Sequence, residues 1–321
     1  MFTETQNKQW CKMGPRAMFG QFMIDLVKKN KKLMIISADL GRSSGLDRFK
    51  KEFPKNYISV GISEQNMIGV ASGLSREGYK VFVTSFAPFL SMRASEQVRM
   101  NLGYMKHNVN LVALGSGVSM GYLGNSHYGL EDLAIMRSIP NISISSPSDC
   151  GELKKTLYDY TFKNRGPAYI RLTGVPGSSA VYTKNYSYKY GKYESLLEGS
   201  KLLVISTGSV TGEALKAIKK LNIEGYSIKL INIHTIKPLD LKITKLMMSF
   251  DKIITIEEHS INGGLYSAIS ELIVKNNMKR KLLPLSLSDK FSVNGKYSFL
   301  LNFHNLSEKK IRNKILNFLK H

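Results

Sequence analysis

Three places in the first half of the chain hold side chains that could do chemistry. Glu64 stands at the start of a helical pattern, where a carboxyl group can act as a general acid or base. Phe86 and Phe89 lie where a strand pattern gives way to a helical one, so the pair could form a platform for a ligand. His127 lies in a loop that contains five glycines between Gly115 and Gly129. An imidazole there could transfer protons near neutral pH.

Each of these residues also has an ordinary structural interpretation. A glutamate in a first helical turn interacts with the helix dipole, a phenylalanine pair is typical of a core, and a lone loop histidine is often structural. Asp39, at the end of the first strand pattern, is explained by an N-capping turn. The sequence Gly115-Ser-Gly117 resembles a dinucleotide fingerprint, but that motif must open a helix at once and residues 122–128 continue as loop. We therefore expect no nucleotide site.

The elements that position these residues follow from the hydrophobic pattern. Short apolar runs alternate with longer amphipathic segments, which predicts parallel sheets covered by helices on both faces. The predicted strands are Leu33–Asp39, Tyr79–Phe86, Val109–Leu114, Ile142–Ser146, Ala168–Leu172, Leu202–Ser206, Ser227–Ile233 and Ile253–Glu257. The predicted helices are Arg16–Asn30, Glu64–Glu77, Phe89–Met105, Leu130–Ser138, Gly151–Lys163, Gly212–Leu221, Leu239–Phe250, Leu265–Lys275 and Ser307–Leu319.

The pattern changes once, between the two series of elements. Residues 174–190 are rich in glycine, serine and tyrosine, and they show neither the hydrophobic period of a helix nor that of a strand. We therefore place a boundary near residue 185. The length of 321 residues also favours two domains. The predicted fold is α/β, with two doubly wound domains over residues 1–185 and 186–321.

Composition excludes several classes of protein. No apolar run reaches the roughly 18 residues that a membrane-spanning helix needs, and the polar N-terminus does not resemble a signal peptide. The two cysteines, Cys11 and Cys150, cannot form a disulfide framework. We expect a cytoplasmic protein without a membrane partner.

The net charge of +22 raises the question of nucleic acid. The surplus is evenly spread, with +11 on residues 1–185 and +11 on residues 186–321. The densest basic stretches, near Lys279 and Lys309, sit among apolar residues at helical spacing and indicate solvated helix faces. We expect no nucleic-acid partner, although a non-catalytic basic nucleic-acid-binding protein stays an alternative that a steep salt dependence of binding would support.

The order of the motifs is more specific than any one of them. GISEQNM, TSFAPF, GNSHYGLEDLAIMRSIPN, SPSD and GPAYIRL follow one another in the first half. TGS, EEHSINGGLYSAISEL and a closing DKF…NG…HNLSEKKI follow in the second. This set resembles the transketolase family, with a thiamine-diphosphate pyrimidine-binding domain followed by the family's C-terminal domain. The resemblance covers roughly residues 10–320 and is strongest to the carboxy-terminal subunit of split, two-chain transketolases.

The resemblance implies roles for individual residues around thiamine diphosphate. Glu64 matches the glutamate that hydrogen-bonds the aminopyrimidine ring and shares a proton with a ring nitrogen. Phe86 matches the aromatic residue that stacks on the pyrimidine, and Phe89 matches a second wall. Asp39 matches an acidic position on the cofactor side of the subunit interface. The small-residue helix behind Glu64 would supply a dry setting that keeps the carboxyl proton available.

The resemblance also implies a substrate site and a reaction. His127 matches the histidine that contacts the reacting oxygens of the donor, and is expected to be catalytic together with Glu64. Arg16 and Ser43 match residues that reach the substrate phosphate. The implied enzyme is a thiamine-diphosphate-dependent transferase that moves a two-carbon ketol or acetyl unit from a sugar or 2-oxoacid to a carbonyl acceptor.

Three departures from the family pattern concern the substrate. Leu123 stands where transketolases have an aspartate, Gly115 where they have a phosphate-binding histidine, and Thr173 and Gly174 where an arginine is expected. Each lost charged hydrogen bond would cost about 1.5–3 kcal/mol of phosphate recognition. The departures favour an atypical sugar, or a less hydroxylated donor such as pyruvate, over a standard pentose phosphate.

A missing motif indicates a partner. The family holds Mg²⁺ and the diphosphate through a Gly-Asp-Gly motif followed by an asparagine, and this sequence contains no Gly-Asp-Gly. We therefore expect no metal ligands in this chain and a separate amino-terminal subunit that holds the diphosphate and Mg²⁺. We also expect self-association through the smooth helix at residues 67–74, giving a two-plus-two heterotetramer.

Two other members of the superfamily remain alternatives. The beta subunit of a 2-oxoacid dehydrogenase shares the layout and the glutamate, but it works with a lipoyl carrier and has a different histidine loop. Deoxyxylulose-phosphate synthase is closer in chemistry, but it is normally a single chain that includes the diphosphate domain.

Overall fold

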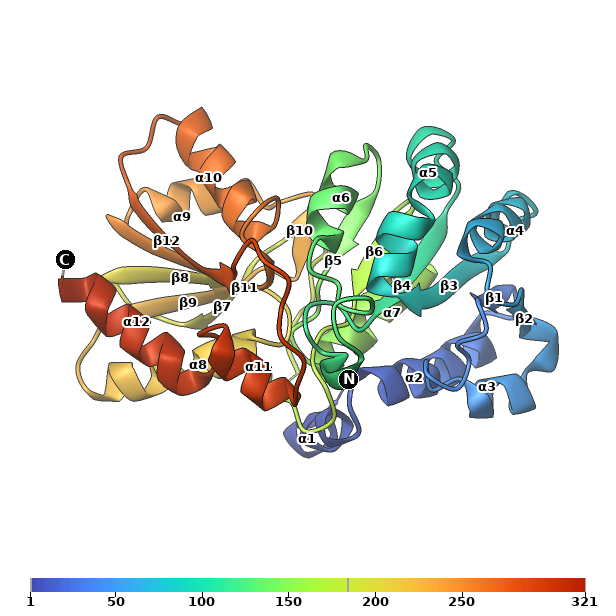
Figure 1. Ribbon diagram of the computed structural model, residues 1–321, viewed down its shortest axis with the longest axis horizontal. Coiled ribbons are helices and arrows are strands. Elements are labelled where there is room, and N and C mark those ends of the chain that lie inside the picture. The colour runs from blue at the N-terminus through green and yellow to red at the C-terminus, as the bar shows by residue number, and fades with distance from the viewer. Residues whose placement is uncertain (1, 184, 321) are drawn as a thin grey trace.

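Two twisted sheets organise the chain, and each is covered by helices on both faces (Figure 1). The computed structural model describes residues 2–183 and 185–320. In spatial order the first sheet contains β10 (Thr235–Lys237), β5 (Ser143–Ser145), β6 (Ala168–Arg171), β4 (Val109–Leu114), β3 (Lys80–Phe86), β1 (Leu33–Ser37) and β2 (Tyr57–Ser59). The second contains β12 (Lys281–Leu287), β11 (Lys252–Ser260), β8 (Leu202–Ser206), β9 (Ile228–Asn232) and β7 (Glu194–Leu197).

The helices divide between the sheets in chain order. Around the first sheet lie α1 (Glu4–Met13), α2 (Pro15–Lys29), α3 (Asp47–Glu52), α4 (Glu64–Arg76), α5 (Ser95–Gln97), α6 (Asp132–Ser138) and α7 (Cys150–Phe162). Around the second lie α8 (Thr211–Ile223), α9 (Ile243–Met247), α10 (Leu265–Lys275), α11 (Tyr297–Phe303) and α12 (Glu308–Lys320). None of the helices in the described part of the chain is long and apolar enough to span a bilayer.

Burial on both faces explains why the strands are continuous apolar runs. In β1, Leu33 and Ile35 join the core that packs under α2 and α7, while Met34 and Ile36 join the core that packs under α4 and α6. Successive side chains of a strand point to opposite faces, so a strand between two helical layers must be apolar at every position. The predicted α/β fold with doubly wound sheets is confirmed.

The strands at the edges depart from the expected parallel arrangement. β10 pairs antiparallel with β5 and β7 pairs antiparallel with β9. β10 is only three residues long and comes from the second half of the chain, yet it completes the first sheet. The apolar core under α4 and α6 continues through Ile236 of β10 to Ile243 of α9 and Leu265 of α10. The two halves are therefore joined by a shared sheet and a shared core.

One predicted helix has a different form. The segment predicted as a single helix over residues 89–105 contains two stretches of wide, π-type turns, Phe89–Arg93 and Val98–Tyr104, with only the short α5 between them. Wide turns of this kind are rare and are frequent at functional sites. This segment begins three residues after Phe86, beside the predicted site.

Candidate active site

The predicted site residues converge at the carboxyl ends of neighbouring parallel strands. Ser37 at the end of β1 pairs with Ser59 of β2 and with Thr84 of β3, and Phe86 of β3 pairs with Leu114 at the end of β4. The segment after β2 leads into α4, which begins at Glu64, and the glycine-rich loop starts directly after β4. In open α/β sheets this edge is where ligands bind.

Glu64 is a buried carboxylate with two side-chain partners. It is 2% exposed. Its Oε1 accepts a hydrogen bond of 3.1 Å from the Ser85 hydroxyl, and its Oε2 accepts one of 2.9 Å from Nη1 of Arg93. Ser85 directly precedes Phe86, so the strand itself fixes the carboxyl group beside the aromatic ring. A buried carboxylate on the first turn of a helix can accept and return a proton to a bound ring without competition from bulk water.

Three rings form an aromatic wall next to this carboxylate. The centroid of Phe86 lies 5.9 Å from that of Phe89 and 5.3 Å from that of His127. Phe89 and His127 are 5.5 Å apart, and all three pairs meet edge to face. The guanidinium of Arg93 lies 4.0 Å from the Phe89 centroid, which connects the wall to Glu64. The cluster thus brings together Glu64, Phe86, Phe89 and His127, as the sequence predicts.

The glycine-rich loop presents His127 to the wall. Backbone hydrogen bonds in both directions between Gly117 and Gly129 close the base of the loop. Nδ1 of His127 lies 2.9 Å from the hydroxyl of Ser126. That contact leaves Nε2 as the nitrogen available to a substrate oxygen. Gly115 has a φ of 68°, and a Cβ there would lie 2.4 Å from the Met120 side chain. A larger residue at this position would therefore have to displace the Met120 side chain and adopt a backbone conformation that side chains rarely take.

Arg16 and Ser43 meet in a separate hollow of about 260 Å³ at the amino end of α2. The loop that carries Ser43 lies directly on α2, because a Cβ on Gly20 would be 1.8 Å from the carbonyl oxygen of Gly45. Burial lowers the pKa of Arg16 from its ordinary value. Arg42 lines the same hollow. Two guanidinium groups and a hydroxyl around one hollow suit an anionic ligand.

Asp39 occupies a different setting from the other predicted residues. It is exposed, two residues beyond the end of β1, and its φ of 58° lies in the left-handed region. Aspartate tolerates this conformation better than most residues. It shares the carboxyl edge of the sheet with Glu64, and its predicted role at a cofactor interface stays a prediction.

The buried Arg171 is committed to the fold. Its Nε donates to both oxygens of Asp132, at 3.0 and 2.9 Å, and its Nη2 donates to the carbonyl oxygens of Gly129 and Glu258. Both side chains of the ion pair are fully buried. Thr173, at the position of the expected phosphate-binding arginine, is also buried and accepts a hydrogen bond from Ser209 N at 2.9 Å.

The side chains of Glu257, Glu258 and His259, in the same region, make hydrogen bonds that stabilise the fold. Glu257 accepts from the amide groups of Leu265 and Tyr266 at the start of α10, and burial raises its pKa to about 7. Burial also raises the pKa of Glu258 to about 7 and lowers that of His259 to about 4. His259 therefore stays neutral at physiological pH, and its Nε2 accepts from the Leu133 amide at 3.1 Å.

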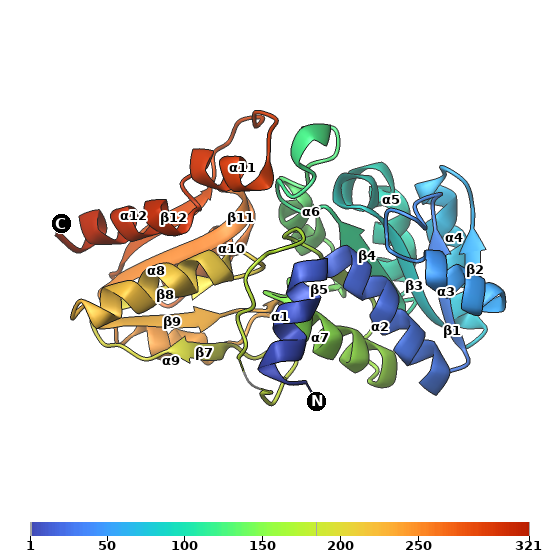
Figure 2. The same cartoon turned by 90° about the horizontal axis from the view of Figure 1, so that it is seen from below.

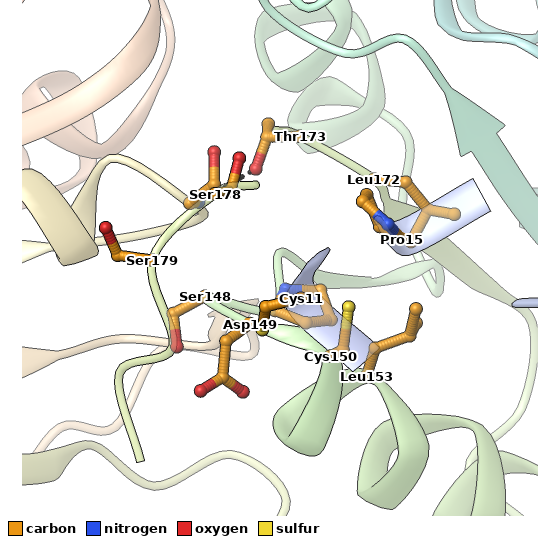
Figure 3. A pocket seen from close by; sticks show the side chains of 12 residues that line it. Cys11, Pro15, Ser148, Asp149, Cys150, Leu153, Leu172, Thr173, Ser178 and Ser179 are labelled. Atoms are coloured by element: carbon orange, nitrogen blue, oxygen red, sulfur yellow. Dashed lines mark hydrogen bonds between the residues drawn. The ribbon is translucent and has the colours of Figure 1, made fainter. Parts of the chain in front are cut away.

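A very small hollow lies between α1, α7 and the connecting segment after β6 (Figure 3). Its volume of about 20 Å³ has room for about one water molecule. Asp149, on its wall, caps α7 through Glu152 N and accepts from the amides of Val181 and Tyr182. The two thiols there, Cys11 and Cys150, are free and buried. These residues hold the connecting segment in place and are no candidate for a substrate site.

Two candidate functional residues, Arg93 and Arg42, were not predicted from the sequence. Arg93 was missed because its approach to Glu64 depends on the wide turns after Phe89, which sequence periodicity cannot show. Arg42 lies in the Asp39–Gly45 loop, and a second cation next to Ser43 is a signal that could have been noticed. Among the described residues, no group of three or more His, Cys, Asp or Glu side chains could hold a metal ion.

Comparison with known proteins covers nearly the whole chain. The family model for "Transketolase, pyrimidine binding domain" matches residues 12–174, and that for "Transketolase, C-terminal domain" matches residues 191–311. The chain is 38% identical over 312 residues to the putative transketolase C-terminal section of Methanocaldococcus jannaschii, with 96% of each chain covered. It is 33% identical to one subunit of the apulose-4-phosphate transketolase of Actinobacillus succinogenes, with 86% of each covered. A solved inactive beta4 tetramer of a split-gene transketolase has a TM-score of 0.84 and 30% identity, covering 96% of this chain and 98% of that one.

Proposed function

Since the chain belongs to the transketolase family as the carboxy-terminal subunit of a split enzyme, we propose that it acts in a thiamine-diphosphate-dependent transferase. The enzyme transfers a two-carbon ketol or acetyl unit to a carbonyl acceptor. The observation that carries this proposal is the cluster of Glu64, Phe86, Phe89 and His127 at one edge of the first sheet.

The residues present fit the pyrimidine end of the cofactor. An aminopyrimidine ring needs an aromatic face and a carboxylate next to a ring nitrogen, and Phe86 and the buried Glu64 are joined through Ser85. When bound, thiamine diphosphate supplies the electron sink for cleavage of a carbon–carbon bond beside a carbonyl group. Glu64 holds a proton at the ring nitrogen, the phenylalanine pair excludes water, and His127 Nε2 hydrogen-bonds the reacting oxygens of the donor.

An amino-terminal partner subunit completes the site. This sequence has no Gly-Asp-Gly motif for Mg²⁺ and diphosphate, so both groups are assigned to that partner. A split-gene transketolase with this fold exists as a tetramer of beta chains that is inactive, which supports both self-association and the need for a partner. We assign self-association to the outer face of α4. There Gly69 and Gly73 have no atom within 4 Å of an added Cβ, and Ile62, in the segment just before α4, is 79% exposed. The enzyme is then a two-plus-two heterotetramer.

The donor is assigned to atypical sugars. A relative is named for apulose 4-phosphate, and the arginine pair of the hollow at α2 supports a ligand with an anionic end. The absence of the usual phosphate ligands at Gly115 and Thr173 argues against a standard pentose phosphate.

A transfer assay tests this function. The chain and its amino-terminal partner are combined with thiamine diphosphate, Mg²⁺ and one donor at a time: pyruvate, apulose 4-phosphate or xylulose 5-phosphate. We expect transfer to an aldehyde acceptor only with both subunits, and loss of transfer in Glu64→Gln. Efficient use of xylulose 5-phosphate would overturn the atypical donor. Reduction of a lipoyl carrier in place of transfer would assign the chain to a 2-oxoacid dehydrogenase.

A further inference from the structure

The histidine loop of the first domain rests on a segment of the second. The segment at residues 289–296 connects β12 to α11, and Figure 2 places it beside the green segment that precedes α6. The views from two directions agree on this neighbourhood (Figures 1 and 2). His127 is therefore held from a domain that contributes no side chain to the aromatic wall.

Asn125 makes the central contact between the two segments. Its Nδ2 donates to the carbonyl oxygen of Ser292 at 2.7 Å, and its Oδ1 accepts from the Ser292 amide at 2.8 Å. The side-chain amide thus pairs with both backbone groups of one residue, which fixes its orientation as well as its position. Asn125 stands two residues before His127.

The contacts around this pair leave little freedom. A Cβ on Gly124 would lie 2.6 Å from the side chain of Asn294, so this side chain packs directly against the backbone of the loop. Tyr128, directly after His127, donates from its hydroxyl to the carbonyl oxygen of Gly121, and the same hydroxyl lies 3.4 Å from the carbonyl oxygen of Val293. His127 is therefore flanked on both sides by residues that contact residues 292–294.

The supporting segment is itself fixed within the second domain. Ser292 is 7% exposed, and its hydroxyl lies 2.7 Å from Nε2 of His304 at the end of α11. At the base of the loop, Glu258 of β11 accepts from the Val118 amide at 2.8 Å and from the Tyr297 hydroxyl at 2.6 Å. The support is a rigid part of the fold and is suited to holding a side chain in register.

We infer that the C-terminal domain sets the position of His127, with Asn125 as the positioning residue through which residues 292–294 act. This inference rests on the proposed function, since His127 is assigned there to the donor oxygens. Displacing a group that binds a reacting oxygen by about 1 Å costs up to about a hundred-fold in rate. The C-terminal domain thereby determines how well a donor is held, without touching it.

Histidine-selective NMR on the full-length chain tests the inference without turnover. The ring signals of His127 are assigned by their loss in His127→Asn, and the rings of Phe86 and Phe89 shift them away from solvent-exposed values. In Asn125→Ala we expect these signals to move towards exposed values. Asn276→Ala removes an exposed asparagine that bonds within its own helix, and it leaves them in place. Unmoved His127 signals in folded Asn125→Ala overturn the inference.

Kinetics of the two-subunit enzyme provide the second measurement. With pyruvate as the probe donor, we expect Asn125→Ala to raise KM about ten-fold or more while the Kd of thiamine diphosphate stays within two-fold. Asn125→Asp keeps the acceptor for the Ser292 amide but sets an oxygen against the Ser292 carbonyl, and it is expected to act in the same direction. An unchanged KM in both variants overturns the inference. If the wild-type subunits neither bind the cofactor nor transfer a two-carbon unit, the proposed function fails, and the NMR result still decides whether Asn125 holds His127.

Discussion

In the described part of the chain, the interdomain cluster and the cluster at the edge of the first sheet differ in how exposed their charged side chains are. In the interdomain cluster, Asp132, Arg171 and His259 are fully buried and engaged with one another or with backbone amides. In the cluster at the edge of the first sheet, a buried Glu64 is paired with Arg93, whose side chain is 46% exposed. The first cluster is closed by the fold, whereas the second reaches the protein surface through Arg93.

The difference shows that burial and a raised pKa are weak guides to function by themselves. Burial raises the pKa of Glu257 and of Glu258 to about 7, in the range of a general acid or base. Both carboxyl groups nevertheless have their oxygens engaged within the fold, Glu257 by the first turn of α10 and Glu258 by Val118 and Tyr297. The oxygens of Glu64 are engaged too, by Ser85 and Arg93, but the Arg93 side chain is 46% exposed. A raised pKa in a buried carboxyl group therefore does not by itself identify a functional site.

Replacing Glu64 tests the open cluster most severely. In the two-subunit enzyme we expect Glu64→Gln to lower kcat about 10²- to 10⁴-fold, because an amide cannot exchange a proton with a bound ring. The thermal midpoint of the chain should change little, since the amide still fits beside Ser85. Glu96 is an exposed carboxylate paired with Arg99, so Glu96→Gln is the matched control and should keep full activity. A kcat of Glu64→Gln within three-fold of wild type would remove Glu64 from the chemistry.

Breaking the closed cluster should lower the stability of the chain and leave cofactor binding unchanged. Asp132→Asn leaves Arg171 buried without a counter-charge, so we expect a loss of about 3–5 kcal/mol in the free energy of unfolding. Urea unfolding measures this loss. Glu271→Gln, which removes the exposed partner of Arg137, should cost less than about 1 kcal/mol. At a temperature where Asp132→Asn is folded, its cofactor affinity should equal that of wild type, and a selective loss of cofactor binding would contradict a structural role.

The pH dependence of the free energy of unfolding tests whether Glu258 has a raised pKa in the folded chain. Its pKa is about 7 in the folded chain against an ordinary 4.5, so the folded chain binds more protons between these values. Ionisation of Glu258 therefore removes stability as the pH rises from about 5 to about 8.

Glu258→Gln fixes this position in a neutral state. Relative to wild type, we expect the variant to gain stability between pH 5.5 and pH 8, by up to roughly 2 kcal/mol, as read from urea unfolding at the two pH values. His259, with its lowered pKa, acts in the opposite direction below pH 6.5, but it is present in both chains and cancels in the difference. A difference in stability that does not vary with pH would show that Glu258 ionises normally in the fold.

The smallest effect is expected in the hollow at α2. Arg42 is exposed, so Arg42→Gln should raise the KM for a phosphorylated ketose only about five- to ten-fold. The KM for pyruvate, which has no distant anionic group, should not change. Arg48→Gln, which removes an exposed arginine paired with Glu52, is the control. Equal effects of Arg42→Gln on both donors would exclude a role for Arg42 in recognising the anionic end.

Much of the fold could be predicted because its central strands are apolar at every position. The strands β1, β3, β4, β5, β6, β8, β9 and β11 all lie within or overlap predicted ones. Of the elements that were missed, β12 is long and apolar but contains Pro284, which is unfavourable within a strand pattern. Others are short or polar. β10 contains a lysine and precedes Pro238, and α1 has only a few apolar residues in its sequence ETQNKQWCKM. Such elements form through tertiary contacts that a hydrophobic pattern does not encode.

The site was predictable in its residue types and less so in its contacts. Glu64, Phe86 and His127 follow strands whose ends must meet at one edge, so their convergence follows from the topology. The approach of Arg93 depends on the wide turns of residues 89–93, and the support of His127 depends on Ser292, more than 160 residues away. Contacts across such distances cannot be read from local patterns.

Calorimetry of cofactor binding tests the shared site most directly. Thiamine diphosphate with Mg²⁺ is titrated into the chain alone, into the chain with its amino-terminal partner, and into the same complex carrying Glu64→Gln or Glu96→Gln. We predict tight binding only in the complex, weakened by Glu64→Gln and retained with Glu96→Gln. Equal binding by the complex with and without the Glu64 carboxylate, or no binding by the complex at all, would contradict a cofactor site shared between the two subunits.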